Sequence, residues 1–295
     1  MKSQNDHIPP TFYYGDREEG TLSFLFSPYP LLKDIALSEH EKVSFKTRDG
    51  LTIDGYLTLP LKGEAPYPTV IHPHGGPGAR DYSGFDTYAS YLTNRGYAVF
   101  RPNFRGSTGY GFEFAQAQMG RWGLEMQDDI TDAAQYLIEQ GIAAPERLCI
   151  FGSSYGGYAA AMATVKTPDL FACSVSFAGI SDLRALAKRI STTYVGGKLS
   201  AQKQIGKSFA DQRARSPING IDAIKTPILL IHGEDDIIMN VEQSRDFADE
   251  LKDAGKEFKY VELEYGDHYL SIQENRTRFF QELDAFLAQH LKDNK

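Results

Sequence analysis

The chain has 295 residues, of which 41% are hydrophobic and 24% charged, and its formal net charge is −8. This is the composition of an ordinary globular protein, and its acidic balance argues against a nucleic-acid partner. The first residues lack the apolar core of a signal peptide, and no apolar run approaches the roughly 18 residues of a membrane span, so we expect a cytoplasmic protein without a membrane partner.

Two hairpins are predicted before the main body of the chain. Residues 1–10 are polar and end in two prolines, which predicts a loose terminus. The segment TFYYGDREEGTLSFLF (11–26) has aromatic residues on both sides of a charged turn, so it predicts a β-hairpin whose apolar side chains need a cover. A second hairpin is predicted over 43–59, where an Asp-Gly pair marks the turn. We therefore divide the chain into an N-terminal extension (1–40) and one domain (41–295).

From about residue 66 the predicted elements alternate between strands and helices. The strands are expected at 68–73, 97–103, 147–151, 171–177, 227–232 and 258–264, and the helices at 85–96, 126–140, 155–166, 241–254 and 274–291. This alternation predicts an α/β fold with a mainly parallel central sheet and helices on both faces. The segment 183–215 is partly helical and is expected as an insertion over the sheet edge.

The chain contains two cysteines, Cys149 and Cys173. Both lie in apolar runs that are predicted to form strands. We therefore expect buried free thiols rather than a disulfide or a metal pair.

A strand, a sharp turn and a helix of small residues are predicted in LCIFGSSYGGYAAA (148–161). Gly152, Ser154 and Gly156 match Gly-x-Ser-x-Gly, the pattern that places a serine nucleophile on a strained turn. Ser153 does not match, because Phe151 stands where its first glycine would have to be. The alternative interpretation is a Gly/Ser-rich turn, so the serine needs partners elsewhere in the chain.

A serine hydroxyl needs a base and a carboxylate that orients the base. His268 follows the strand at 258–264 in a Gly-Asp-His loop and is the best base. Three adjacent carboxylates, Glu234, Asp235 and Asp236, follow the strand before it, and spacing alone does not choose among them. The order of serine, acid and histidine is that of α/β-hydrolases. His232 ends a buried strand and is expected to be structural.

An oxyanion site needs two hydrogen-bond donors. The backbone N–H of Tyr155 would supply one, and the loop HPHGGPG (72–78), in which His74, Gly75 and Gly76 directly follow a strand, would supply the other. His72 and His74 alone could form half of a metal site, but no further histidine or cysteine cluster in the sequence completes one.

These motifs in combination resemble the catalytic domain of the prolyl oligopeptidase family of serine peptidases, especially its acylaminoacyl-peptidase and dipeptidyl-peptidase branches. The resemblance begins near residue 43 and extends to the C-terminus. It rests on RDGLTIDGYLTLP, HPHGGPG, RPNFRGSTGYG, RWG, FGSSYGGYAA, SPI and LLIHGEDD. It implies an α/β-hydrolase fold.

The resemblance also implies roles for single residues. Ser154 would be the nucleophile, and His268 would be the base. Asp236 would be the orienting acid, because His232, Gly233 and Asp236 fit the family's His-Gly-x-x-Asp pattern.

Further groups around the site are implied in the same way. Tyr155 would donate its backbone amide to the oxyanion, helped by Gly76 or His74. Asn103 and Arg105 would border the substrate. No cofactor and no metal are expected.

Two departures from the family pattern bear on the substrate. Met239 and Asn240 stand where the family usually has Val-Pro, and no β-propeller precedes the domain in this sequence. The hairpin at 11–26 resembles the end of a propeller blade, so its apolar surface could drive homo-oligomerisation. We expect a serine hydrolase that forms an acyl-enzyme on short or N-blocked peptides. The alternatives are a carboxylesterase acting on small acyl esters and a non-catalytic fragment of a larger peptidase.

Overall fold

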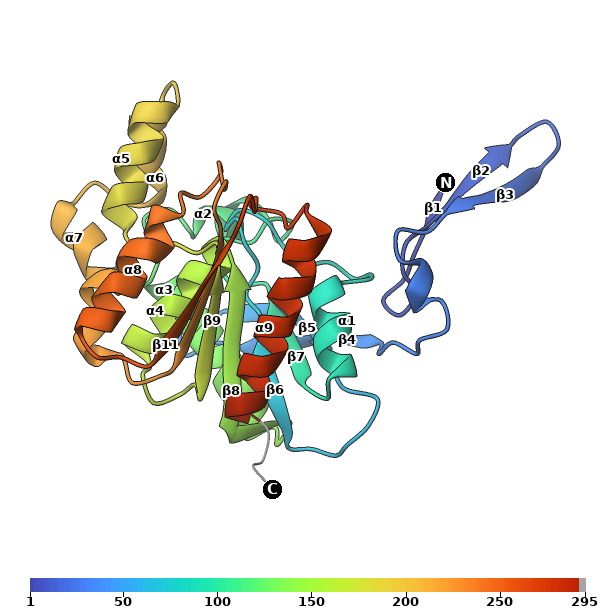
Figure 1. The fold of residues 1–295 in the computed structure, drawn as a ribbon, viewed down its shortest axis with the longest axis horizontal. Coiled ribbons are helices and arrows are strands. Elements are labelled where there is room, and N and C mark those ends of the chain that lie inside the picture. Colours follow the sequence, from blue (N-terminus) through green and yellow to red (C-terminus); the bar gives the residue numbers. More distant parts are fainter. Residues whose placement is uncertain (292–295) are drawn as a thin grey trace.

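The computed structural model describes residues 1–291, and its centre is an eight-stranded sheet (Figure 1). The strands lie in the order β11-β10-β9-β8-β6-β7-β5-β4. The six strands from β11 to β7 are parallel, and β5 and β4 are antiparallel to their neighbours. The predicted mainly parallel sheet is therefore confirmed. The strands are β4 (His40–Lys46), β5 (Thr52–Thr58), β6 (Tyr67–Ile71), β7 (Ala98–Pro102), β8 (Ala143–Ser153), β9 (Cys173–Phe177), β10 (Ile228–Gly233) and β11 (Phe258–Leu263).

Helices cover both faces of the sheet because successive side chains of a buried strand point to opposite sides. Val70 of β6 packs in the same core as the helices α1 and α9, whereas its neighbour Ile71 packs with α3 and α4. The helices are α1 (Thr87–Asn94), α2 (Phe112–Gln116), α3 (Glu125–Glu139), α4 (Tyr155–Lys166), α5 (Leu183–Thr193), α6 (Gly197–Gln204), α7 (Phe209–Ala214), α8 (Glu242–Asp253) and α9 (Gln273–Leu291). The short helix α2 was not expected from the sequence.

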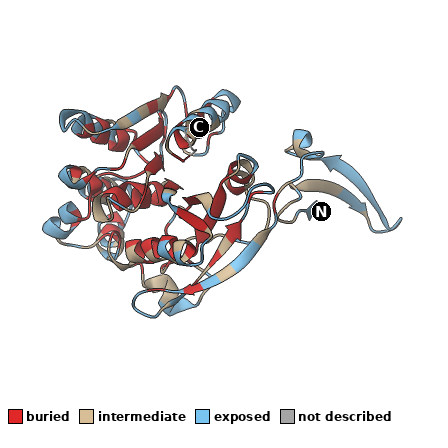
Figure 2. Cartoon of the chain, turned by 90° about the horizontal axis from the view of Figure 1, so that it is seen from below, coloured by how far each residue is buried: buried red, intermediate tan, exposed pale blue. Residues whose placement is uncertain are grey.

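The N-terminal extension forms a separate antiparallel sheet that projects from the body (Figure 1). The predicted hairpin is present as β2 (Thr11–Asp16) and β3 (Thr21–Phe26). The expectation of a loose terminus is wrong at β1 (Lys2–Ser3), which pairs with β2. All six residues of β3 are exposed and pale blue in Figure 2, whereas β2 is mostly intermediate in burial and largely tan. Within residues 1–291, no helix is long and apolar enough to cross a membrane.

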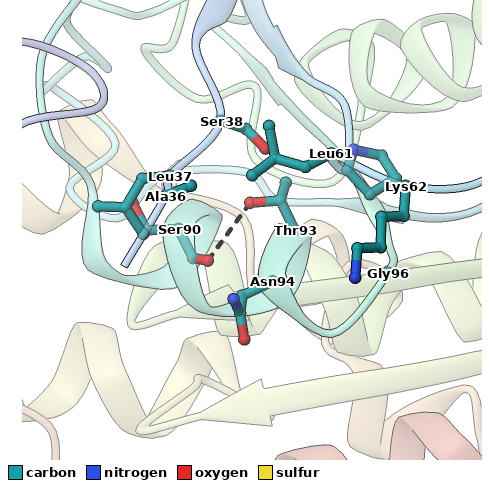
Figure 3. Close-up of a pocket in the computed structure, with 10 residues that line it drawn as sticks. Ala36, Leu37, Ser38, Leu61, Lys62, Ser90, Thr93, Asn94 and Gly96 are labelled. Carbon is teal, nitrogen blue, oxygen red and sulfur yellow. Dashed lines mark hydrogen bonds between the residues drawn. The ribbon is translucent and has the colours of Figure 1, made fainter. Parts of the chain in front are cut away.

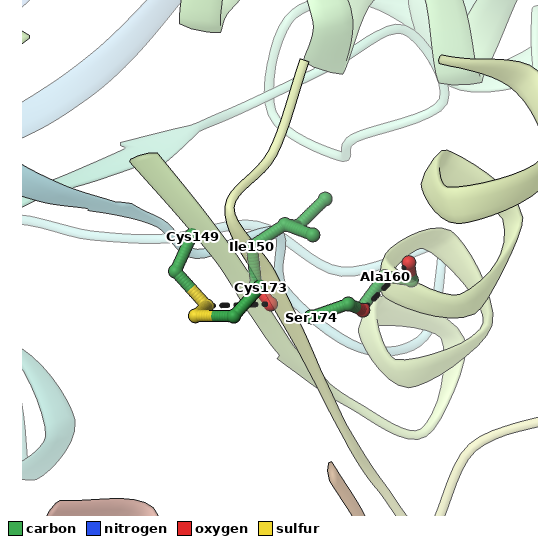
Figure 4. The surroundings of a disulfide bond; sticks show 5 residues. All are labelled: Cys149, Ile150, Ala160, Cys173 and Ser174. Atoms are coloured by element: carbon green, nitrogen blue, oxygen red, sulfur yellow. Dashed lines mark hydrogen bonds between the residues drawn. A yellow bond between two sulfur atoms is a disulfide. The ribbon is translucent and has the colours of Figure 1, made fainter. Parts of the chain in front are cut away.

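The two cysteines form a disulfide, so the expectation of free thiols is wrong (Figure 4). Cys149 of β8 lies directly opposite Cys173 of β9 in the parallel register, and their Cα atoms are 4.8 Å apart. This separation is within the range that a disulfide spans. The pairing depends on the register between two strands, which neither apolar run reveals by itself.

A small hollow of about 160 Å³ lies between the extension and α1 (Figure 3). Leu61 and Lys62 of the β5–β6 loop line it together with Thr93 and Asn94 near the end of α1. These segments lead into the amino ends of β6 and β7. The hollow therefore lies at the edge opposite to the carboxyl ends of the parallel strands, where α/β enzymes bind their ligands.

Candidate active site

Ser154 occupies the turn between β8 and α4 in a conformation that non-glycine residues rarely adopt. Its φ is 58° and its ψ is −117°. A Cβ atom on Gly152 would overlap the backbone of Gly156, and a Cβ on Gly156 would overlap the carbonyl oxygen of Pro73. Both positions therefore require glycine, as the sequence pattern predicts. Ser153 points its hydroxyl into the protein, where the oxygen is buried.

Asp236 and His268 meet at the carboxyl edge of the sheet. Asp236 follows β10, His268 follows β11, and Nδ1 of His268 lies 2.6 Å from Oδ2 of Asp236. The backbone amides of Ile238 and Met239 donate to the other carboxylate oxygen, at 2.8 and 2.7 Å. The carboxylate is therefore held from both sides, with one oxygen aimed at the imidazole.

Burial separates Asp236 from the two carboxylates beside it. Glu234 and Asp235 are exposed, whereas Asp236 is buried. Burial by itself raises the pKa of Asp236, but hydrogen bonds from His232, from His268 and from the Met239 amide outweigh it and hold this pKa below its usual range. The carboxylate is therefore ionised at neutral pH and can orient a histidine.

The loops that carry Asp236 and His268 contact each other through backbone atoms. The amide of Asp235 donates to the carbonyl of Gly266 at 2.9 Å, and a Cβ atom on Gly233 would overlap that same carbonyl group. Asp267 accepts hydrogen bonds from the amides of Tyr269 and Ser271 and so shapes the turn around His268. Within residues 1–291, no hydrogen bond joins Ser154 to His268. In ligand-free enzymes such a bond is often long and forms only when substrate binds.

The HPHGGPG loop passes close to Ser154. A Cβ atom on Gly75 would lie 3.1 Å from the carbonyl oxygen of Ser153 and 3.5 Å from Cβ of Ser154. Gly76 has a φ of 123°, a value that favours glycine. Tyr155 begins α4, so its amide is one of the helix's unpaired N-terminal donors. The backbone of this loop and of Tyr155 therefore approach the serine from two sides.

The imidazole of His74 points into the protein. Nδ1 lies 2.8 Å from the carbonyl oxygen of Gly75, Nε2 lies 2.8 Å from Oγ of Ser107, and the ring stacks on Phe104. Burial lowers the pKa of His74 to about 4, so the ring is neutral at pH 7. Both ring nitrogens therefore face partners within the protein, and the Ser107 hydroxyl in turn donates to the carbonyl oxygen of Phe104 at 2.7 Å. Only the backbone amide of His74 is left to donate to an oxyanion.

Asn103 and Arg105 are engaged by partners within the protein. The side chain of Asn103 is buried, accepts from the amide of Asp81 at 2.7 Å and donates to the hydroxyl of Tyr110 at 2.9 Å. Arg105 donates to both carboxylate oxygens of Asp129, at 2.8 and 2.6 Å. Both side chains shape the loop after β7, and their predicted contact with substrate stays a prediction.

Three further residues support the loops around the site. Ser107, which the sequence did not single out, fixes His74, and the glycine-rich segment that contains it gave no signal for this role. His232 is structural, as predicted: Nδ1 lies 2.7 Å from Oγ of Ser244, and Nε2 lies 3.0 Å from the Met239 carbonyl oxygen. The ring of His72 likewise bonds to the carbonyl of Phe151.

The two histidines of the HPH sequence therefore bond to different partners. In residues 1–291 no group of three or more histidine, cysteine, aspartate or glutamate side chains is arranged to hold a metal ion.

The model of the prolyl oligopeptidase family matches residues 83–294. The chain belongs to this family. Over 96% of its length it is 36% identical to dipeptidyl aminopeptidase BIII of Pseudoxanthomonas mexicana, of which it covers 43%.

Two solved structures superpose on nearly the whole chain. A puromycin-hydrolyzing peptidase of Mycobacterium tuberculosis superposes with a TM-score of 0.88 and 30% identity. The match covers 98% of this chain and 45% of the chain of that peptidase. The acylaminoacyl peptidase of Pyrococcus horikoshii has a TM-score of 0.86 and 28% identity, covering 100% of this chain and 48% of its own. The chain thus spans less than half the length of each of these three proteins.

Proposed function

We propose that the chain is a serine peptidase that cuts short or N-blocked peptides through an acyl-enzyme. The observation that carries this proposal is the bond between Asp236 and His268 at the sheet edge where Ser154 occupies its strained turn. The names of the relatives support the substrate class, since one is a dipeptidyl aminopeptidase and another an acylaminoacyl peptidase.

The proposed reaction has two halves. Oγ of Ser154 attacks the carbonyl carbon of the scissile amide while His268 takes the hydroxyl proton. The amides of Tyr155 and of Gly76 or His74 bind the oxyanion. The C–N bond then breaks, His268 gives the proton to the leaving amine, and an ester links the acyl group to the serine. Water attacks this ester with His268 again acting as base, and the proton finally returns to the serine.

The first experiment compares Ser154→Ala with Ser153→Ala on the full chain. Ser154→Ala should lose labelling by a fluorophosphonate and lower turnover by several orders of magnitude, because the nucleophile is gone. Ser153→Ala is the matched control and should keep both, because that hydroxyl is buried and points away. Labelling of Ser154→Ala would refute the mechanism. If neither the wild type nor Ser153→Ala were labelled, the mechanism would also be refuted, and a non-catalytic fragment would be favoured.

The substrate class is tested separately with an N-acetyl aminoacyl p-nitroanilide and a p-nitrophenyl ester of the same acyl group. A peptidase should cleave both with comparable acyl-group preference. Cleavage of the ester alone would favour the carboxylesterase alternative, because esters demand less of the site than amides do.

A further inference from the structure

The helices α5 to α7 carry a charge opposite to that of the rest of the protein. Residues 183–215 contain eight lysines or arginines and one aspartate, a formal charge of +7. The whole chain carries −8, so the remaining residues carry −15. In the sequence these helices follow β9 and precede β10. In space, α5 and α6 project beyond the sheet (Figure 1).

Most of these cations face solvent without a carboxylate partner. Two of the eight are engaged elsewhere: Arg215 is buried and donates to four backbone carbonyls, and Arg189 donates to the carbonyl of Ile237. The other six are exposed, and none forms a salt bridge within residues 1–291. They are Arg184, Lys188, Lys198, Lys203, Lys207 and Arg213. A surface field of one sign attracts ligands of the opposite sign.

Four of the six cations line a groove of about 540 Å³ between α5, α6 and the start of α7. They are Arg184, Lys188, Lys198 and Lys207. The one carboxylate in the lining, Asp182, already accepts two amide hydrogen bonds as the N-cap of α5. Phe209 adds an apolar surface, over which the guanidinium of Arg184 lies at 4.3 Å. A groove of this volume holds a few side chains.

The groove lies one helix away from the catalytic carboxylate. The contact from Arg189 of α5 to the carbonyl of Ile237 joins this helix to the residue that follows Asp236. Because a helix is about 10 Å across, an extended peptide crosses it in roughly three to four residues. An extended peptide that lies against the Asp236 loop therefore spans the distance to the groove within a few residues.

We propose that this groove binds an acidic segment of a peptide substrate, with aspartate or glutamate side chains contacting its four cations. The inference rests on the proposed peptidase function and adds a charge preference to it. A short acidic segment fits better than a nucleic acid, because a longer polyanion would extend onto a body whose charge is −15.

Binding is measured on Ser154→Ala, which cannot consume the probe. The probe is a fluorescein-labelled, N-acetylated octapeptide with four glutamates, and the reference is the same peptide with four glutamines. Exposed ion pairs contribute modestly, so several together should make the glutamate peptide bind roughly tenfold tighter at low salt. Fluorescence anisotropy should show this difference shrinking as salt screens the charges.

The groove is tested with a charge reversal of Lys188→Glu, Lys198→Glu and Lys207→Glu in one protein. This variant should lose the preference for the glutamate peptide. The matched control makes the same change in net charge at three exposed lysines elsewhere, with Lys2→Glu, Lys46→Glu and Lys62→Glu. This control should keep most of the preference for the glutamate peptide. Circular dichroism checks both folds, and replacing the three groove lysines by glutamine should give an intermediate preference.

Three results would overturn the proposal. They are equal binding of the two peptides, equal loss in the groove and control variants, and tighter binding of a single-stranded oligonucleotide of the same charge than of the glutamate peptide. Failure of the wild type to cleave any peptide would count against the proposed function alone, since binding is measured without catalysis. With cleavage, kcat/KM should favour the glutamate substrate in the wild type and not in the groove variant.

Discussion

At the scale of single residues, burial decides which of three neighbouring carboxylates serves His268. Glu234 and Asp235 lie in water, whereas Asp236 is buried with one oxygen on two amides and the other on the imidazole. A carboxylate fixed in this way holds the histidine tautomer whose Nε2 is free to accept a proton. The family pattern chose the same residue, and the structure supplies the physical reason.

Asp236→Asn should lower kcat by roughly 10³- to 10⁴-fold while leaving the fold intact. An amide in place of the carboxylate can turn its NH₂ group toward the ring and stabilise the wrong tautomer. The measurement is p-nitroanilide turnover, with Asp235→Asn as the exposed matched control that should keep near wild-type activity. Equal effects at the two positions would refute the proposed role of Asp236 as the orienting acid.

His74 should make the protein less stable as the pH falls below about 6.5. Its pKa in the fold is lowered to about 4 by burial, so between these values the unfolded chain binds a proton that the folded chain does not. The free energy of unfolding therefore decreases on acidification by up to about 1.4 kcal/mol per pH unit. Unfolding in urea from pH 7 to 4.5 should show a shallower decline for His74→Gln than for the wild type. An identical slope in both proteins would contradict the assignment, and His7→Gln serves as the partly exposed control.

At the scale of elements, local rules determine the elbow more completely than any other segment. The helix predicted over 155–166 is present with those bounds, since Gly152 and Gly156 leave room for backbone atoms and the small residues that follow can pack against the sheet. The elements that the sequence missed, β1 and α2, have two and five residues. Elements this short lack a periodic pattern, and β1 exists only because β2 pairs with it.

The N-terminal hairpin carries the proposal of a homo-oligomer. β3 is an edge strand whose six residues are all exposed, so a second copy of this strand could pair with its open edge and cover its apolar side chains. Leu22→Lys with Phe24→Lys should then shift the protein from dimer to monomer in light scattering after gel filtration. Leu61→Lys changes an exposed leucine elsewhere and should leave the dimer. A monomeric wild type would refute the proposal.

At the scale of the whole molecule, charge is divided between two regions. The body around the sheet is acidic, whereas α5 to α7 are basic, and α5 contacts the loop in which Asp236 meets His268. Raising the salt concentration should therefore reduce kcat/KM for a glutamate-rich peptide and change it little for its glutamine counterpart. Steady-state kinetics at two ionic strengths checks this, and equal salt dependence of the two substrates would contradict it.

The sequence by itself determined the succession of strands and helices along the chain and the strained turn at Ser154. It also determined that the serine, the proposed acid and the proposed base follow one another in that order. These features follow from local rules: apolar periodicity, the steric need for glycine and the chain order of α/β-hydrolases. Only the tertiary structure decided the disulfide between Cys149 and Cys173, the inward direction of the His74 ring and the internal partners of Arg105. Each of these features depends on how the residues of one element are aligned with those of another. Register and packing between elements cannot be predicted from either segment alone.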